Sequence, residues 1–194
     1  MILDQFSLQG KVAIVTGASR GLGRGMALAL AEAGADIVGV GISDSSSTGE
    51  AVEALGRRYL AHTADLTDKA CVPGIVTATK KAFGRIDILV NNAGGALFTP
   101  HVLAEVQEKD WNLVVDVNLK GAFLFCQAAI PAMQQRGGGA IVNISALAAH
   151  WRASLAGVQY TAAKAGVEGL TRQLAYDWGK AGIRVNAVAP TVTL

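Results

Sequence analysis

The chain has 194 residues, 51% of them hydrophobic, which predicts a single domain with a substantial core and excludes a disordered protein. The formal net charge is only +2, without basic runs or interleaved aromatic residues, and this argues against nucleic acid as a partner. We expect no apolar stretch long enough to span a membrane and no leader peptide, hence a soluble, cytoplasmic protein without a membrane partner.

The first strand is predicted at residues 11–16, because its β-branched run is typical of a parallel strand covered on both faces. Gly17, Gly21 and Gly23 follow, and apolar residues then recur at helical spacing from Met26 to Ala33. Glycine lets backbone N–H groups approach a ligand closely, and a helix N-terminus favours an anion. The loop therefore predicts a pyrophosphate site. An ordinary strand–turn–helix connection is the alternative for this motif alone.

The remaining elements alternate along the chain. A loop is predicted at residues 41–49 and another at 146–157. Further strands are predicted at residues 36–40, 59–62, 86–90, 140–145 and 183–188. Helices are predicted at residues 50–57, 108–133 and 158–180, and another helix follows Thr67 and ends at Phe83. Strands and helices in this alternation predict an α/β fold, a Rossmann-like doubly wound parallel sheet in one domain, residues 1–194.

The predicted helix 108–133 is apolar nearly all round, so one sheet face cannot cover it. We therefore expect a homo-oligomer, and specifically a homotetramer. Cys71 and Cys126 are the only cysteines, and neither has a His or Cys at ligand spacing. No metal site is predicted, and both thiols are expected to be reduced, mostly buried and without a chemical role.

Candidate site residues follow the strands. The carboxyl ends of the predicted strands carry these residues: Gly17, Asp65, residues 91–94 and Ser145. Open parallel sheets bind their ligands at these ends. Tyr160 and Lys164 begin the next helix, near the same edge.

Tyr160 and Lys164 are four residues apart, so they share one helix face. An ammonium ~5 Å from the phenol, at an effective dielectric constant of ~20, favours the phenolate by ~3 kcal/mol. That equals about two pKa units and would make Tyr160 a workable general acid and base. For the pair alone, an ordinary Tyr–Lys pair on a solvated helix face is the alternative.

Together these motifs resemble the short-chain dehydrogenase/reductase family over almost the whole chain. They are the glycine loop 16–23, Asp65, residues 91–94, Asn118, a serine at a strand end and Tyr160-x-x-x-Lys164. The resemblance implies NAD(P) as the cofactor and a small-molecule alcohol or carbonyl compound as the substrate. It also implies direct hydride transfer between the nicotinamide and the substrate carbon.

The resemblance further implies a role for each site residue. Asn118 would bend the long helix and order a proton-relay water, and Ser145 or its neighbour would hold the substrate oxygen. Tyr160 would move the proton, while Lys164 would bind the nicotinamide ribose and lower the pKa of Tyr160. Asp65 would accept from the adenine amino group. The residues expected at the cofactor are Gly17, Ser19, Arg20, Gly21, Leu22, Gly23, Asp65, Leu66, Asn91, Ala93, Gly94, Tyr160, Lys164 and Pro190.

Within the family, the first part of the chain most resembles sugar-acid dehydrogenases of the 2-deoxy-D-gluconate 3-dehydrogenase (2-keto-3-deoxygluconate oxidoreductase) group. The resembling stretches are residues 6–12, 23–28, 36–39, 54–59 and 63–66. The carboxylate of a sugar acid needs a cation, and Arg152 is the only basic candidate besides His150 on the loop before Tyr160. A solvent-facing arginine is the alternative at that position, and we expect no catalytic role for His150.

Two other functions stay open. One is a generic carbonyl or 3-oxoacyl reductase, in which the apolar residues 96–98 would face an apolar substrate. The other is a non-catalytic dinucleotide-binding protein. The choice of coenzyme is also open: Gly41 stands where NAD-binding proteins usually have an acid, Asp44 follows in the loop, and Arg20 could meet a 2′-phosphate.

Two departures from the family pattern matter. Family members usually continue beyond Pro190 with a glycine, a helical lid and a further strand, so we expect a C-terminal part to be missing. They also usually place the catalytic serine second in a pair, whereas this chain reads Ser145-Ala146. Neighbouring strand residues point to opposite faces. A β-bulge would re-aim Ser145, and we favour Ser145 as the oxygen-binding group on that basis.

Overall fold

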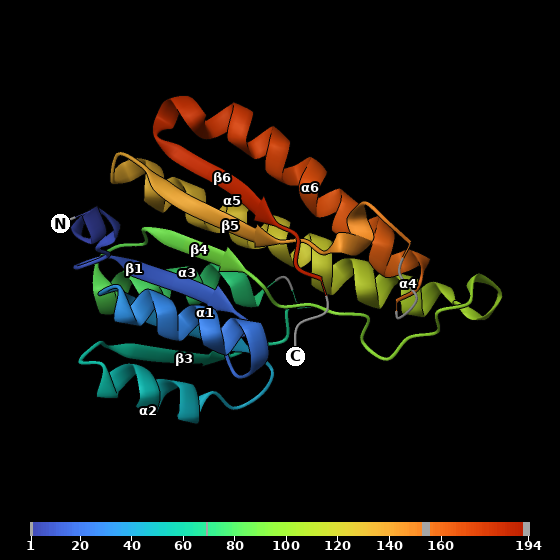
Figure 1. Ribbon diagram of the computed structural model, residues 1–194, viewed down its shortest axis with the longest axis horizontal. Coiled ribbons are helices and arrows are strands. Elements are labelled where there is room, and N and C mark those ends of the chain that lie inside the picture. Colours follow the sequence, from blue (N-terminus) through green and yellow to red (C-terminus); the bar gives the residue numbers. More distant parts are fainter. Residues whose placement is uncertain (1, 69, 153–155, 192–194) are drawn as a thin grey trace.

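The computed structural model describes residues 2–68, 70–152 and 156–191 (Figure 1). Within these residues six parallel strands form one sheet in the order β3-β2-β1-β4-β5-β6. The strands are β1 (Val12–Thr16), β2 (Asp36–Gly41), β3 (Tyr59–Thr63), β4 (Ile88–Asn91), β5 (Gly139–Ile144) and β6 (Ile183–Val188). The order reverses direction beside β1, which confirms the predicted doubly wound, Rossmann-like sheet.

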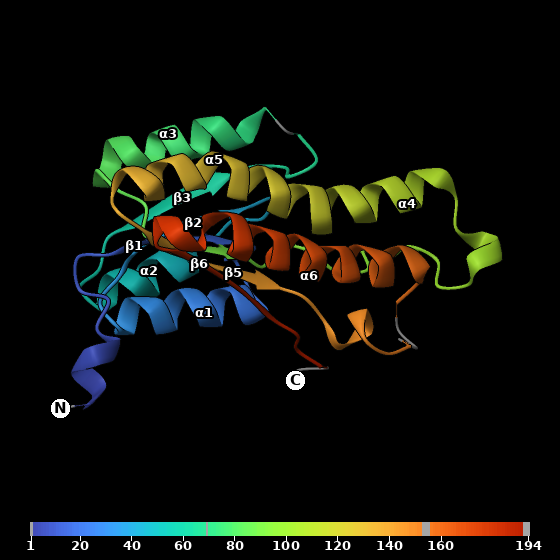
Figure 2. The same cartoon turned by 90° about the horizontal axis from the view of Figure 1, so that it is seen from above.

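Helices cover both faces of the sheet (Figure 2). They are α1 (Gly21–Glu32), α2 (Ser46–Ala54), α3 (Cys71–Phe83), α4 (Glu108–Val115), α5 (Gly121–Gln135) and α6 (Val158–Trp178). Parallel strands need crossover connections, and right-handed crossovers place successive helices on opposite faces wherever the strand order reverses. Here α1 and α2 pack on one face, whereas α3, α5 and the end of α6 pack on the other.

The core consists of two clusters separated by the sheet. Successive side chains of a strand point to opposite faces, so β1 contributes to both clusters. Ile14 packs with Phe125 of α5 on one face, while Ala13 and Val15 pack against α1 on the other. All five residues of β1 are buried, as its apolar run predicts.

The predicted loop at residues 41–49 is too long, because α2 begins at Ser46. The Asp44 carboxylate accepts hydrogen bonds from the backbone N–H and the hydroxyl of Ser46, at 3.0 and 2.5 Å. Thr48 donates to the carbonyl of Ala18 at 3.0 Å, and Gly49 lies against the ring of Tyr59. These tertiary contacts bring a serine-rich segment of low intrinsic helix propensity into the helix.

The predicted long helix is present as α4 and α5, joined by a π turn at Asp116–Lys120. Among the described residues, the stretch Glu108–Gln135 is long and apolar enough to cross a membrane by length and composition. The expectation that no stretch reaches that length is therefore wrong. One side of the helix packs into the core through Phe125 and Met133, and Trp111, Leu113 and Phe123 remain exposed.

Candidate active site

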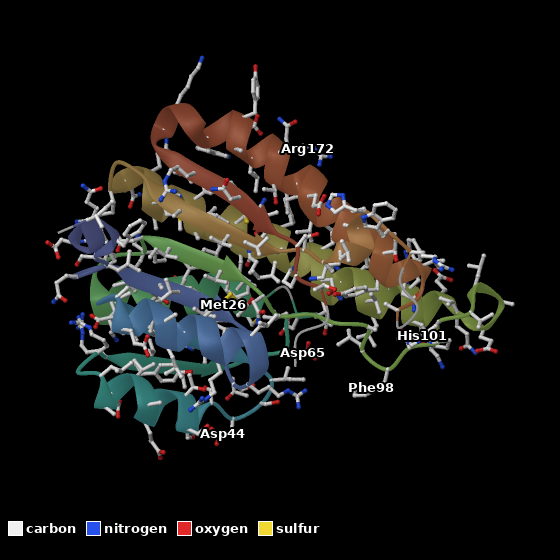
Figure 3. The ribbon with its side chains drawn as sticks, viewed as in Figure 1. Met26, Asp44, Asp65, Phe98, His101 and Arg172 are labelled. Atoms are coloured by element: carbon white, nitrogen blue, oxygen red, sulfur yellow. The ribbon has the colours of Figure 1, made fainter. Side chains whose placement is uncertain are left out.

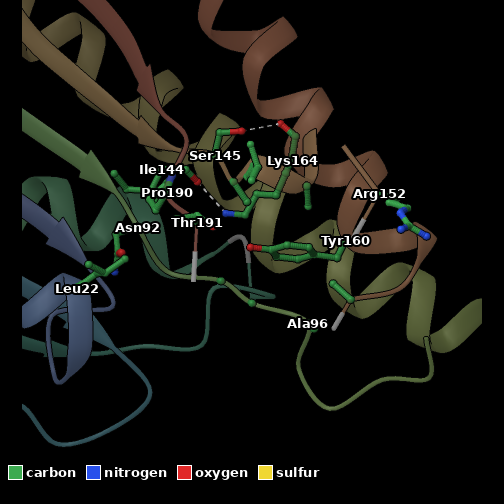
Figure 4. Close-up of a pocket in the computed structure, with 16 residues that line it drawn as sticks. Leu22, Asn92, Ala96, Ile144, Ser145, Arg152, Tyr160, Lys164, Pro190 and Thr191 are labelled. Carbon is green, nitrogen blue, oxygen red and sulfur yellow. Dashed lines mark hydrogen bonds between the residues drawn. The ribbon is translucent and has the colours of Figure 1, made fainter. Parts of the chain in front are cut away.

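A cavity of about 450 Å³ lies at the carboxyl ends of β1, β4, β5 and β6 (Figure 4). Parallel strands end at one edge, so segments distant in sequence meet there. Several of the predicted site residues line it together, among them Gly94, Tyr160 and Lys164. The lining residues are Leu22, Asn92, Gly94, Gly95, Ala96, Ile144, Ser145, Ala146, Leu147, Ala148, Arg152, Ala156, Tyr160, Lys164, Pro190 and Thr191.

Hydrogen bonds between the ends of β1 and β4 hold the glycine loop. The Thr16 hydroxyl accepts from the backbone N–H groups of Asn92 and Ala93, at 2.9 and 3.0 Å. The Asn92 amide donates to the Thr16 carbonyl at 2.9 Å. This network leaves no room for side chains: a Cβ on Gly17 would meet the Asn92 amide, and a Cβ on Gly23 would meet the Gly17 carbonyl.

The loop fits the pyrophosphate that the glycine pattern predicts. Gly21 has a φ of +55°, and no atom lies within 4 Å of the place a Cβ would take, so the start of α1 is open to a ligand. The first turn of α1 contains no acidic residue. Arg20 precedes α1 and is exposed, whereas Ser19 is half-buried. Unpaired N–H groups and the positive end of the helix dipole therefore face open space.

The turn after β3 presents Asp65 at the same edge of the sheet (Figure 3). Its carboxylate accepts from the backbone N–H and hydroxyl of Thr67, at 2.9 and 2.8 Å, and Asp65 remains exposed. Leu66 is buried in the core. Asp65 is thus placed to meet a ligand, whereas Leu66 anchors the turn.

The Asn91 side chain lies inside the protein. Its amide nitrogen donates to the Asn143 side chain at 2.8 Å and lies 3.3 Å from the Cys126 sulfur. Its carbonyl oxygen is buried and has no partner within the described part of the chain. The Asn91 side chain therefore links β4 to β5 and α5. Within the 91–94 motif, Asn92 and Gly94 are the residues that line the cavity.

Asn118 lies in the π turn and is 2% exposed. Its carbonyl oxygen accepts from the Gly95 N–H at 3.0 Å, and its amide donates to the Gly95 and Val114 carbonyls, at 3.0 and 2.9 Å. A Cβ on Gly94 would meet this amide. Asn118 therefore holds the segment Gly94-Gly95 as a wall of the cavity. Its role in ordering a relay water stays a prediction.

Tyr160 and Lys164 project from the first turns of α6 into the cavity (Figure 4). The Lys164 ammonium donates to the Ile144 carbonyl at 2.7 Å and lies 5.6 Å from the centroid of the Tyr160 ring. Burial lowers the pKa of Lys164 to about 8. The Tyr160 hydroxyl has no hydrogen-bond partner among the described residues and is therefore free for a substrate.

Burial also raises the pKa of Tyr160 above its usual value. In the protein alone the net direction is thus opposite to the one expected, and the effect of the Lys164 charge on the pKa of Tyr160 stays a prediction. The ammonium is directed at the Ile144 carbonyl, and removal of water from around the phenol disfavours its charged form.

Ser145 does not turn toward Tyr160. The pairing of β5 with β6 is regular up to Ile144 and Val188, so the bulge that would re-aim Ser145 is absent, and that prediction is wrong. The Ser145 hydroxyl lies 2.8 Å from the Glu168 carboxylate. It also lies 3.3 Å from the Lys164 carbonyl (Figure 4). Ser145 and Ala146 both line the cavity, but the Ser145 hydroxyl is directed at α6, and Ala146, in extended conformation, offers only a methyl group.

Glu168 was missed in the sequence. It follows Lys164 by four residues, so it continues the helix row that begins at Tyr160, and this spacing could have identified it. Its carboxylate also accepts from His150, with 2.9 Å between the two atoms. His150 thus ties the loop after Ala146 to α6 and takes no place in the cavity. Asn92 was likewise missed, although it lies within the 91–94 motif.

The segments on either side of the cavity mouth differ. Arg152 lines it and is exposed, with no acidic partner in the described part of the chain; residues 153–155 of the same predicted loop lie outside the described residues. Of the apolar residues 96–98, only Ala96 lines the cavity. Leu97 and Phe98 have φ angles of 55° and 57°, and the Phe98 side chain is fully exposed on a segment that projects beyond the sheet (Figure 3).

The cysteines lie away from the cavity lining. Both are free, Cys71 half-buried and Cys126 buried. Burial raises the pKa of Cys126 to about 12, so its thiol stays protonated at neutral pH. Among the described residues, no group of three or more His, Cys, Asp or Glu side chains is placed to hold a metal ion.

Comparisons with known proteins agree with this geometry. The short chain dehydrogenase family matches the chain over residues 11–194. A 2-dehydro-3-deoxy-D-gluconate 5-dehydrogenase of Escherichia coli is 48% identical over 98% of this chain and 74% of its own length. A D-threitol dehydrogenase of Mycolicibacterium smegmatis is 42% identical over 97% and 72%. The structure of carveol dehydrogenase from Mycobacterium avium in complex with NAD is 34% identical over 94% and 71%, with a TM-score of 0.88.

The chain belongs to the short-chain dehydrogenase/reductase family. Like its relatives, the protein is an NAD(P)-dependent oxidoreductase of CH–OH groups, and it is built on a Rossmann-like sheet. The predicted family, the predicted class of enzyme and the NAD(P) dependence are thereby confirmed.

Replacing Gly23 by alanine should weaken cofactor binding, because the new Cβ would push the Gly17 carbonyl and displace the loop. Overpacking of this kind costs about 1–3 kcal/mol, so we expect about a tenfold or greater rise in the Kd for NADH or NADPH. Fluorescence titration of the reduced coenzyme measures this Kd. Gly25→Ala, in the same helix and with open space around it, is the control and should bind normally. Normal binding by a folded Gly23→Ala protein would contradict the assignment.

Proposed function

We propose that this enzyme transfers hydride between NAD(P) and a secondary alcohol or ketone of a sugar acid or a related polyol. The observation that best supports this proposal is the Tyr160 hydroxyl, which has no partner among the described residues. It lies in one cavity with Lys164 and beside the open glycine loop. Two relatives are named for a deoxy sugar acid and a third for a polyol, which supports this class of substrate. Only Ala96 of the apolar segment 96–98 reaches the cavity, so the wall expected for a generic carbonyl reductase is incomplete.

In the proposed mechanism, bound NAD(P) supplies the hydride acceptor or donor. The glycine loop would hold its pyrophosphate through Gly17, Ser19, Gly21 and Gly23, and Asp65 would accept from the adenine. Leu22, Gly94 and Pro190 line the cavity and would enclose the reacting end and exclude water. Arg20 and Asp44 would set the preference between NADP and NAD, since Arg20 suits a 2′-phosphate and Asp44 a ribose hydroxyl.

Tyr160 would take the proton of the substrate hydroxyl during oxidation and return it during reduction. Because the pKa of Lys164 is about 8, its side chain is largely charged at neutral pH, and this charge favours the tyrosinate that must form. Lys164 is also proposed to bind the nicotinamide ribose. Asn118 would act on the reaction by fixing Gly95 and, with an ordered water, by relaying the proton.

Tyr160→Phe should lower kcat by about 10²–10⁴-fold, the range for loss of a general acid and base. Its cofactor Kd should stay close to that of the wild type, because only the proton-transferring hydroxyl is lost. Lys164→Ala should impair both quantities. Steady-state kinetics with coenzyme titrations separate the two variants. If Tyr160→Phe kept more than about a tenth of the wild-type kcat, another residue would be the acid and base.

Arg152 is proposed to bind the carboxylate of a sugar acid, since it lines the cavity and is not paired with an acid within the described residues. A hydrogen bond to a charged group contributes about 1.5–3 kcal/mol, so Arg152→Ala should raise KM for the sugar acid about tenfold or more. KM for a neutral polyol should change little. Arg172→Ala, an exposed arginine outside this cavity, is the control. Equal changes in KM for both substrates would show that Arg152 does not read the carboxylate.

We also propose that residues 1–194 act as one domain carrying both the cofactor site and the catalytic residues, and that the protein works in the cytoplasm as a homotetramer. The exposed apolar side chains of the long helix support association. Phe123→Glu should therefore lower the mass measured by light scattering at micromolar concentration. Leu55→Glu is a matched control, because both side chains are 43% exposed. A monomeric wild-type protein under the same conditions would contradict the proposed homotetramer.

A further inference from the structure

The wall beside Tyr160 has a methyl group where the family usually has a hydroxyl. Ala146 lines the cavity at that position, and its backbone is extended, as ordinary strand register requires. The preceding Ser145 is 2% exposed, and its hydroxyl is engaged by Glu168. Glu168 is itself held by His150, so this cluster keeps the Ser145 hydroxyl directed at α6, although Ser145 is one of the residues that line the cavity.

Few polar groups of the cavity are left to bind a reacting oxygen. The Lys164 ammonium donates one of its three hydrogens to the Ile144 carbonyl, and the nicotinamide ribose is the proposed partner of the others. The Asn92 amide donates to the Thr16 carbonyl. The Arg152 guanidinium points away from the Tyr160 hydroxyl (Figure 4). Among the described lining residues, Tyr160 and Thr191 have hydroxyls without a described partner, and Thr191 follows β6 on another wall.

The missing hydroxyl matters because charge develops on the substrate oxygen during hydride transfer. Loss of one donor to such an oxygen typically slows catalysis about 10²–10³-fold. A substrate with a hydroxyl on the adjacent carbon can supply a donor itself, because the two oxygens of a vicinal pair approach about 2.8 Å. The five-membered ring bends the O–H···O angle, so this donor is weaker than a well-placed serine hydroxyl. The small Ala146 side chain leaves space for that second hydroxyl beside Tyr160.

We propose that this site selects substrates that bear a hydroxyl next to the reacting carbon, and that this hydroxyl replaces the absent serine. The inference rests on the proposed function and narrows its substrates to vicinal diols and α-hydroxy ketones. In oxidation, the carbinol C–H bond breaks and its hydride reduces NAD(P)⁺ to NAD(P)H. The O–H proton passes to Tyr160 and the carbinol becomes a ketone. The neighbouring hydroxyl donates a hydrogen bond and keeps its proton.

The test compares two ketones that differ by one hydroxyl, cyclohexanone and 2-hydroxycyclohexanone. Wild-type kcat/KM should be about tenfold higher for the hydroxy ketone, the effect of one modest hydrogen bond. Ala146→Ser should raise kcat/KM for cyclohexanone by a similar factor and change that for 2-hydroxycyclohexanone less than about threefold, because the second donor is then already present. Ala149→Ser adds the same hydroxyl in the same short turn but outside the cavity lining, and it should change neither value.

A binding measurement supplies a readout independent of turnover. Trifluoroethanol has an acidic hydroxyl and no neighbouring one, so the NAD⁺ complex of Ala146→Ser should bind it about tenfold more tightly than wild type, as one added hydrogen bond to a charged oxygen allows. Calorimetry gives this Kd, and Ala149→Ser, outside the cavity lining, should match the wild type.

Three results would overturn the inference. Equal gains, or no gain, for both ketones in Ala146→Ser would show that the methyl group does not limit the site. A loss of about 10²-fold on both ketones in Ser145→Ala or Thr191→Val would identify that residue as the donor. Turnover of neither ketone by any of these proteins, with NADH or NADPH still bound, would overturn this inference. All three results leave the proposed function standing, and loss of turnover on sugar acids and polyols would be needed to overturn that function.

Discussion

Every strand of the sheet runs in the same direction, and this constraint determines where the site can be. Six strands end at one edge, and each following segment must leave from that edge before a helix returns across a face. The glycine loop, the turn at Asp65, the segment Gly94-Gly95 and the Ser145-Ala146 pair therefore meet without being near in sequence. Because the strand order reverses beside β1, the connections on its two sides diverge and leave open space between them.

Two buried polar contacts make that edge rigid. Thr16 and Asn92 join the ends of β1 and β4 through backbone and side-chain hydrogen bonds. The Lys164 ammonium joins α6 to β5 by donating to the Ile144 carbonyl, and it is 3% exposed. A buried ammonium without a partner would be strongly unfavourable, so this hydrogen bond fixes the start of α6 and with it the position of Tyr160.

Much of the fold follows from local patterns that leave few alternatives. The buried β-branched runs identified the strands, including β1, and Gly84 ended α3 with the positive φ that such a terminus requires. The errors arose where distant contacts decide the outcome. Serines enter α2 because Thr48 and Gly49 have partners on other elements, which no local propensity records. Likewise, an apolar helix does not reveal how much of it the sheet will cover.

The site was predictable in its members and less so in their orientations. Tyr160 and Lys164 share a face because they are four residues apart, and their cavity follows from the end of β5. The direction of the Ser145 hydroxyl depends on Glu168, and the direction of the Lys164 ammonium on a carbonyl of another strand. Charges and hydroxyls choose partners across the fold, so their pKa values and free hydrogen-bonding sites emerge only when that fold is known.

The cavity combines a part that cannot change with a part that can. The coenzyme half is tightly packed around Gly17, Gly23 and Asn92. A larger side chain at any of these three positions would clash with the other two unless they changed at the same time. Ala146 and Arg152, by contrast, make no side-chain hydrogen bond or ion pair to another described residue. Mutation can therefore explore new substrates at the wall while the coenzyme half stays intact and the folding stability is little affected. Evolution within such a scaffold would diversify what is oxidised long before it altered what accepts the electrons.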